Sequence, residues 1–104
     1  YMTSNHLPRG QGLMDMVPNP EFQYSETAKN GVAFGLGFSI VQSTQEAGLI
    51  GSIGNYAWGG AAATIFWCDP VERMSVVFCT QVMGMQPPNM LRDKLGNYIY
   101  GALE

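Results

Sequence analysis

The tripeptide Trp58-Gly59-Gly60, with the apolar run AAATIFW that follows it, constrains this chain more than any other feature. The run is rich in β-branched and aromatic residues, so it predicts a buried strand over residues 56–67. Glycines at the mouth of such a strand mark a bulge, or a place where a ligand or another backbone comes very close. Two interpretations follow: a tight strand entry packed under a helix, or a backbone that itself offers N–H donors to a bound group.

Two further segments have strand patterns. Bulky and small residues alternate strictly over residues 32–42, which predicts a strand buried on both faces. Residues 74–82 are expected to pair as a hairpin with 56–67, across a turn that begins at Asp69-Pro70. The Gly-rich connection between the first two strands leaves room for a short strand at 48–53.

The end of the chain has the pattern of an amphipathic helix. Prolines stop the last strand, and Asn89 is a plausible N-cap residue. One apolar stripe follows at helical spacing: Leu91, Leu95, Tyr98, Ile99 and Ala102. We therefore expect an α+β fold, with an antiparallel β-sheet over residues 32–82, a C-terminal helix over 89–104 packed on it, and a loop-rich lead-in over 1–31.

Composition excludes several classes of function. The net charge is −3 and there is no basic cluster, so nucleic-acid binding is not expected. The single histidine, His6, and the two cysteines do not have the spacing of a zinc site, and no cofactor or metal is predicted. Cys68 and Cys79 are expected to be buried free thiols. Nothing in the sequence indicates a cellular compartment.

The share of charged residues is low. It is 12%, against about 25% in typical soluble domains. A small domain has a high surface-to-volume ratio and should need more charge. We therefore expect much of the surface to be covered, either by the remainder of a larger protein or by self-association.

Five segments together resemble the C-terminal part of the penicillin-recognising serine hydrolases. They are YAWGGAAATIFWCDP, MSVVFCTQ, NMLRDKLGNYIYGALE, MTSNHLP and GVAFGLGFSIV. The resemblance is greatest to family VIII carboxylesterases and class C β-lactamase homologues, and implies a β-lactamase/transpeptidase-like fold. The Ser-x-x-Lys nucleophile motif and the Tyr-containing second motif of that group do not occur in these 104 residues. The expectation is therefore that residues 1–104 are the C-terminal portion of one such domain, that the missing N-terminal part is its partner, and that the chain alone is inactive.

The resemblance also implies site residues. Trp58, Gly59 and Gly60 stand where the lactamases have Lys-Thr-Gly, so they would bind substrate, and the backbone N–H of Ala61 would be an oxyanion donor. Trp58 replaces a cation and Gly59 a hydroxyl that normally hold the carboxylate of a β-lactam. Their replacement favours a neutral ester or amide as the substrate.

Three classes of function stay open. The first is the C-terminal part of a serine esterase or β-lactamase-like hydrolase, acting on a small ester or β-lactam. The second is a non-catalytic relative that binds without cleaving. The third is a small interaction module, which should be soluble and monodisperse in isolation.

Overall fold

A five-stranded antiparallel sheet forms the centre of the molecule, with the strands in the order β1-β2-β3-β4-β5. A computed structural model describes residues 1–17, 29–83 and 88–104. The strands are β1 (Val32–Phe34), β2 (Ser39–Val41), β3 (Tyr56–Gly59), β4 (Ile65–Asp69) and β5 (Met74–Phe78). Two short 3₁₀ helices, η1 (Pro8–Gly10) and η2 (Leu13–Met16), precede them.

The single strand predicted over residues 32–42 is wrong, because this segment folds back on itself as the β1–β2 hairpin. Phe34 lies opposite Ser39, and the N–H of Gly35 donates to the carbonyl of Phe38 at 2.9 Å. Gly37 has a φ of +103°, which a residue with a side chain rarely adopts. The alternation thus reflected two short strands joined by a glycine turn.

The strand allowed at 48–53 is absent from the described structure, where helix α1 (Thr44–Ala47) stands just before this segment. The hydroxyl of Ser43 caps the helix by accepting from the N–H of Glu46 at 3.2 Å. Gly48, in the left-handed conformation, ends it.

Strand β4 pairs with both its neighbours in a regular ladder. Trp58 of β3 lies opposite Phe66, which in turn lies opposite Val77 of β5. The β4–β5 hairpin confirms the pairing expected around Asp69-Pro70. Cys68 is half-buried and Cys79 is exposed, so the expectation of two buried thiols is wrong, although both are free.

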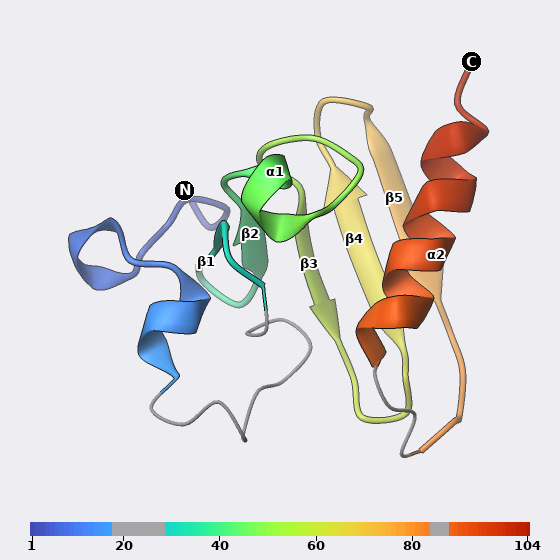
Figure 1. Ribbon diagram of the computed structural model, residues 1–104, viewed down its shortest axis with the longest axis horizontal. Coiled ribbons are helices and arrows are strands. Elements are labelled where there is room, and N and C mark those ends of the chain that lie inside the picture. The colour runs from blue at the N-terminus through green and yellow to red at the C-terminus, as the bar shows by residue number, and fades with distance from the viewer. Residues whose placement is uncertain (18–28, 84–87) are drawn as a thin grey trace.

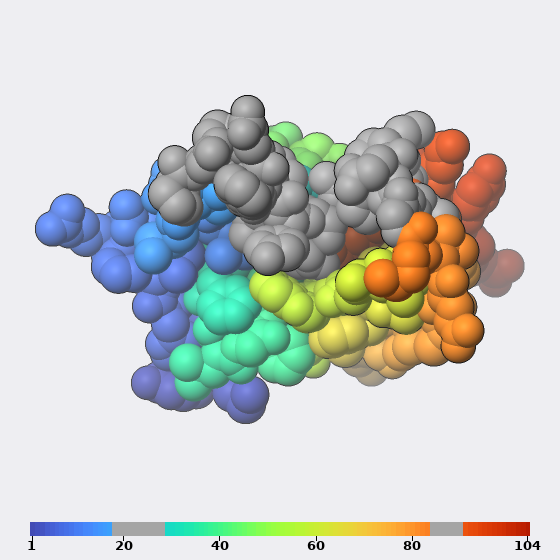
Figure 2. Space-filling model, turned by 90° about the horizontal axis from the view of Figure 1, so that it is seen from below, coloured from blue at the N-terminus to red at the C-terminus, as the bar shows by residue number. Residues whose placement is uncertain are grey.

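Helices α1 and α2 (Pro88–Gly101) lie on the same side of the sheet (Figure 1). Figure 2 shows this layering from below, with the green and red helical segments above the cyan and yellow strands. Leu95, Ile99 and Tyr100 of α2 pack against a buried cluster on the facing strands, made of Ala57, Ile65 and Trp67. The C-terminal helix on an antiparallel sheet confirms the α+β class.

The helix stripe differs in part from the one predicted. Leu95 and Ile99 face the sheet, but Tyr98 is 78% exposed, and Tyr100 is turned inward instead. None of the described helices has the length and apolarity needed to cross a membrane.

Candidate functional site

Trp58 and Gly59 end strand β3, and the chain then reverses in a tight turn. The N–H of Gly60 donates to the carbonyl of Thr64 at 2.8 Å, and the N–H of Ala63 donates to the carbonyl of Gly60 at 3.0 Å. A Cβ atom at Gly60 would collide with the Thr64 hydroxyl oxygen. Of the two interpretations of this glycine, the described contacts support the structural one, because a side chain of the turn itself approaches it.

Ala61 is not on a strand. The expected strand over 56–67 is instead two strands, β3 and β4, and Ala61, which is exposed, begins the turn between them. The segment is interrupted because Ala63 adopts a left-handed φ of +60°, which reverses the chain direction. No residue in the described part of the chain accepts a hydrogen bond from the Ala61 N–H.

A second segment anchors this turn. The carbonyl of Ala62 accepts hydrogen bonds from the N–H of Val82 and from the hydroxyl of Thr80, each at 3.2 Å. The backbone beside Ala61 is therefore held by Thr80 and Val82, which follow the end of β5. This contact joins segments 18 residues or more apart, and no local pattern in the sequence indicates it.

The β2 side of β3 is only partly paired. The ladder between them ends where Ser39 faces Ala57, so Trp58 and Gly59 have no partner there among the described strands. The N–H and C=O of Gly60 both point into the turn toward β4. Successive residues of a strand point these two groups in opposite directions. Gly59 therefore directs its N–H and C=O away from β4, toward the β2 side.

Trp58 is half-buried and stands edge-on to Phe34 of β1, with the ring centroids 5.5 Å apart. The sequence pattern predicted that Phe34 is one of the bulky residues of a single long strand. Its place beside Trp58 depends instead on the β1–β2 hairpin, which the pattern did not indicate. Phe38 extends the aromatic surface, with its ring 5.3 Å from Tyr56 and 6.1 Å from Phe66. The structure thus gives Trp58 an apolar, aromatic setting.

A separate polar network lies under α2. The carboxylate of Asp69, 1% exposed, accepts hydrogen bonds from the Tyr100 hydroxyl at 2.7 Å and from the N–H groups of Ser52, Val71 and Glu72. Asn55 donates its side-chain N–H to the Tyr100 oxygen at 2.9 Å. One buried carboxylate thereby joins a loop, a turn and the last helix.

The network shifts the pKa of both acids. Burial raises the pKa of Asp69, but its hydrogen bonds, with that from Tyr100 foremost, lower it more, so the pKa lies below its usual value. Burial, then the hydrogen bond and the charge of Asp69, raise the pKa of Tyr100. At neutral pH the pair is therefore a carboxylate and a neutral phenol.

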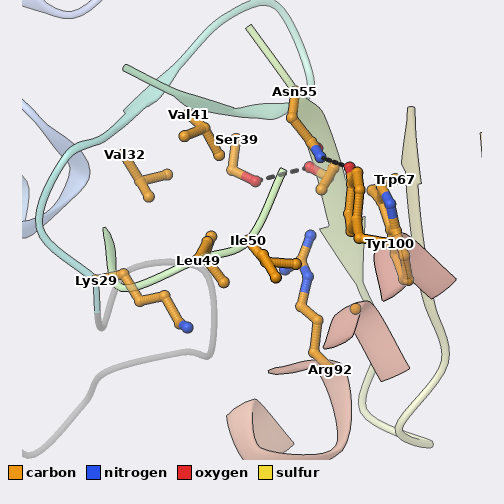
Figure 3. A pocket seen from close by; sticks show the side chains of 12 residues that line it. Lys29, Val32, Ser39, Val41, Leu49, Ile50, Asn55, Trp67, Arg92 and Tyr100 are labelled. Carbon is orange, nitrogen blue, oxygen red and sulfur yellow. Dashed lines mark hydrogen bonds between the residues drawn. The ribbon is translucent and has the colours of Figure 1, made fainter. Parts of the chain in front are cut away.

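The network closes one end of a cavity of about 50 Å³, in which Asn55, Tyr100 and Trp67 lie opposite Lys29 (Figure 3). That volume holds a few water molecules. The indole N–H of Trp67 is buried and has no hydrogen-bond acceptor among the described residues. Asp69, Tyr100 and Asn55 are structural in character, because the hydrogen bonds described here join them to one another and to nearby backbone N–H groups.

No activated nucleophile is found at the cavity among the described residues. The hydroxyl of Ser39 donates to the carbonyl of Ala57 at 2.9 Å, and the ammonium of Lys29 is paired with Asp93 at 2.7 Å. The described part of the chain also contains no group of three residues able to hold a metal ion.

Several solved structures are similar to this chain. The chain is similar to EstCE1, a hydrolase with promiscuous acyltransferase activity. The match has a TM-score of 0.63 and 25% sequence identity, and covers 68% of this chain and 19% of that one. The fold of the matched part is therefore hydrolase-like, and the match spans about a fifth of the length of EstCE1. No family model matches the sequence, and no curated protein matches it.

Proposed function

We propose that this chain is the C-terminal part of a serine hydrolase of the β-lactamase-related group, which acts on small esters through an acyl-enzyme. The structural likeness of this chain to EstCE1, a hydrolase, supports the proposal. β-Lactams and amides pass through the same kind of tetrahedral intermediate and are the alternative substrates.

In this proposal the backbone N–H of Ala61 stabilises the oxyanion of that intermediate. Its exposed position, two residues after the end of β3, and the lack of an acceptor in the described part of the chain both support the role. The anchored carbonyl of Ala62 favours a fixed geometry, which an oxyanion donor requires. A single such donor contributes roughly 3–4 kcal/mol to stabilising the transition state.

In this proposal Trp58, Gly59 and Gly60 line the substrate site, and Gly60 acts there by holding the turn rather than as a backbone donor, because its N–H is bonded to the carbonyl of Thr64. The ring of Trp58 stands against Phe34 and offers no charge to a substrate carboxylate. Gly59 directs its backbone groups toward the half of β3 that lacks a described partner strand. A neutral ester with an apolar acyl group fits these properties better than an anionic β-lactam.

The nucleophile has to come from outside residues 1–104, because covalent catalysis requires an activated serine or its equivalent. The purified 104-residue chain should therefore not hydrolyse the p-nitrophenyl ester of a short acid. Burst kinetics, or a stable acyl adduct on one of its serines, would show that this expectation is wrong.

The donor role is tested in the complete polypeptide that contains these residues. Ala61→Pro removes the N–H, and kcat on a neutral ester should fall by about 10²–10³, with a smaller change in KM. Ala61→Gly keeps the N–H and is the matched control, expected to have mild effects.

The melting temperature of both variants separates loss of the donor from loss of the fold. A folded Ala61→Pro protein with near-normal kcat would contradict the assignment and leave Trp58-Gly59-Gly60 as a packing motif. A complete polypeptide that binds esters but turns none over would favour the non-catalytic relative instead.

A further inference from the structure

We propose that Thr80 is a positioning residue, whose hydroxyl orients the backbone N–H of Ala61 by holding the turn between β3 and β4. The inference rests on the proposed function, because it gives Thr80 a role in an oxyanion site. Thr80 acts through the carbonyl of Ala62, to which its hydroxyl donates a hydrogen bond at 3.2 Å, and not on the substrate itself.

The direction of the Ala61 N–H is fixed first by its own peptide group. A peptide bond is planar and almost always trans, so this N–H points opposite to the carbonyl of Gly60. That carbonyl accepts from the N–H of Ala63 at 3.0 Å, which closes a β-turn over residues 60–63. The Gly60 carbonyl therefore points into the turn, and the Ala61 N–H points out of it.

The turn is bonded internally, but its place relative to the sheet depends on a contact from outside. The N–H of Gly60 donates to the carbonyl of Thr64 at 2.8 Å, and this bond closes the hairpin end on itself. In the described part of the chain, residues 61–63 accept hydrogen bonds from outside the turn at the Ala62 carbonyl alone. Its donors follow β5, so they set the tilt of the turn.

The Thr80 hydroxyl makes two of the contacts at this point. It donates to the Ala62 carbonyl, and it accepts from the N–H of Val82 at 3.2 Å. The Val82 N–H also donates to the Ala62 carbonyl at 3.2 Å, so it is divided between two acceptors. The hydroxyl is therefore the undivided donor to Ala62, and it also holds the second donor in place.

The ladder of the sheet does not supply this support. Ile65 lies opposite Phe78 at the end of the β4–β5 ladder, and the same register continued would place Ala63 opposite Thr80. Ala63 instead has a φ of +60°, which takes the chain out of the ladder. A residue with a Cβ atom keeps this conformation only where its surroundings stabilise it. A side-chain hydroxyl thus replaces a ladder contact beside Ala61.

Loss of the hydroxyl should affect turnover more than substrate binding. An oxyanion donor works only if it is in position before the charge develops, and a hydrogen bond weakens steeply with poor geometry. Thr80→Val keeps the shape of the side chain and removes the hydroxyl. We expect kcat to fall by about three- to tenfold, with a smaller change in KM.

The test is steady-state hydrolysis of a p-nitrophenyl ester of a short acid by the complete polypeptide. Thr80→Ser keeps the hydroxyl and should restore most of kcat. Thr44→Val is the matched control, because Thr44 is also half-buried and lies in α1, at the other end of β3 from this turn (Figure 1). It should leave kcat unchanged. Thermal unfolding verifies that the variants are folded, and Thr80→Ala is the second variant without a hydroxyl.

A double-mutant cycle with Ala61→Pro separates positioning from general support of the fold. Proline is favoured at the second position of a β-turn, which Ala61 occupies here, so this background is compatible with the turn. Thr80→Val should cause almost no further loss of kcat in it, because the N–H that Thr80 positions is already gone. A purely structural effect of Thr80 would multiply with that of Ala61→Pro.

The outcomes also separate this inference from the proposed function. If Ala61→Pro lowers kcat but Thr80→Val does not, the positioning role is overturned and the donor role of Ala61 stands. The positioning role is also overturned if Thr80→Ser fails to restore kcat, if Thr44→Val has an equal effect, or if the two losses multiply. Near-normal kcat in folded Ala61→Pro, or no turnover by the complete wild-type polypeptide, would overturn both.

Discussion

The hydroxyl of Tyr100, in α2, donates a 2.7 Å hydrogen bond to the carboxylate of Asp69 at the end of β4. The two residues are 31 positions apart, and their contact joins the last helix to the sheet. Because Asp69 is 1% exposed, its charge depends on its hydrogen-bond donors rather than on water.

Removing this hydroxyl should weaken the fold. Tyr100→Phe deprives a buried carboxylate of one donor and Asn55 of its acceptor, so the free energy of unfolding should fall by about 1.5–3 kcal/mol. Urea denaturation measures the change. Tyr98→Phe is the matched control on the same helix, since Tyr98 is 78% exposed, and it should change stability by less than about 0.5 kcal/mol. Equal effects of the two variants would contradict the role of the Asp69 contact.

The same pair predicts the pH dependence of stability. The pKa of Asp69 is lowered in the folded state, so its contribution is present above about pH 4 and is lost as the pH falls through the folded-state pKa. The pKa of Tyr100 is raised, so its contribution is present below about pH 10 and is lost as the pH rises further.

Urea denaturation as a function of pH measures both the acid loss and the alkaline loss of stability. In Tyr100→Phe the free energy of unfolding should fall less at alkaline pH than in the wild type, because the titrating phenol is gone. An alkaline loss of stability of the same size in both proteins would assign that loss to other groups.

Gly31 should tolerate no side chain. Its φ is +67°, and a Cβ atom there would lie 2.7 Å from the carbonyl oxygen of Ser43. Gly31→Ala therefore combines a backbone penalty with a steric clash and should cost about 3 kcal/mol. Gly10→Ala, at a φ of +71° with open space around it, isolates the backbone penalty of about 1 kcal/mol. Thermal unfolding of the two variants compares them, and similar costs would show that the Ser43 contact relaxes freely.

A glycine at position 73 should stabilise the turn between β4 and β5. Arg73 precedes β5 with a φ of +53°, a strained conformation for a residue with a Cβ atom. Arg73→Gly should raise the free energy of unfolding by about 0.5–1 kcal/mol, after allowing for the greater freedom of glycine in the unfolded chain. Arg73→Ala removes the same charge but keeps the strain, so chemical denaturation should show no comparable gain for it.

The elements predicted correctly are those whose signals are local. The β-branched residues of β4 and β5 and the turn at Asp69-Pro70 lie next to one another in the sequence, and so the hairpin could be inferred. The helix after Pro88 also follows from its periodicity. These patterns depend on neighbours a few positions away, and the structure contains them with modest shifts of boundary.

The errors in the strands have a common physical cause, which is chain reversal at small residues. Alternation over residues 32–42 is compatible with one strand or with a glycine hairpin, and the contact between Leu36 and Met2 that helps to hold the hairpin is not a local pattern. Ala63 has the left-handed conformation without being a glycine. The residue types after Gly60 therefore do not indicate a turn. The inward turn of Tyr100 in place of Tyr98 likewise follows from the distant carboxylate of Asp69.

The two tryptophans of the chain occupy opposite faces of the sheet. Trp67, opposite Ala57, is 3% exposed beneath α2, whereas Trp58, the next residue after Ala57 along β3, is half-buried and points to the other face. A water-soluble quencher should therefore reduce the emission of Trp58 well before that of Trp67. The molecule thus has two built-in fluorescent reporters. Trp67 reports release of the last helix, and Trp58 reports binding of another molecule to the opposite face of the sheet.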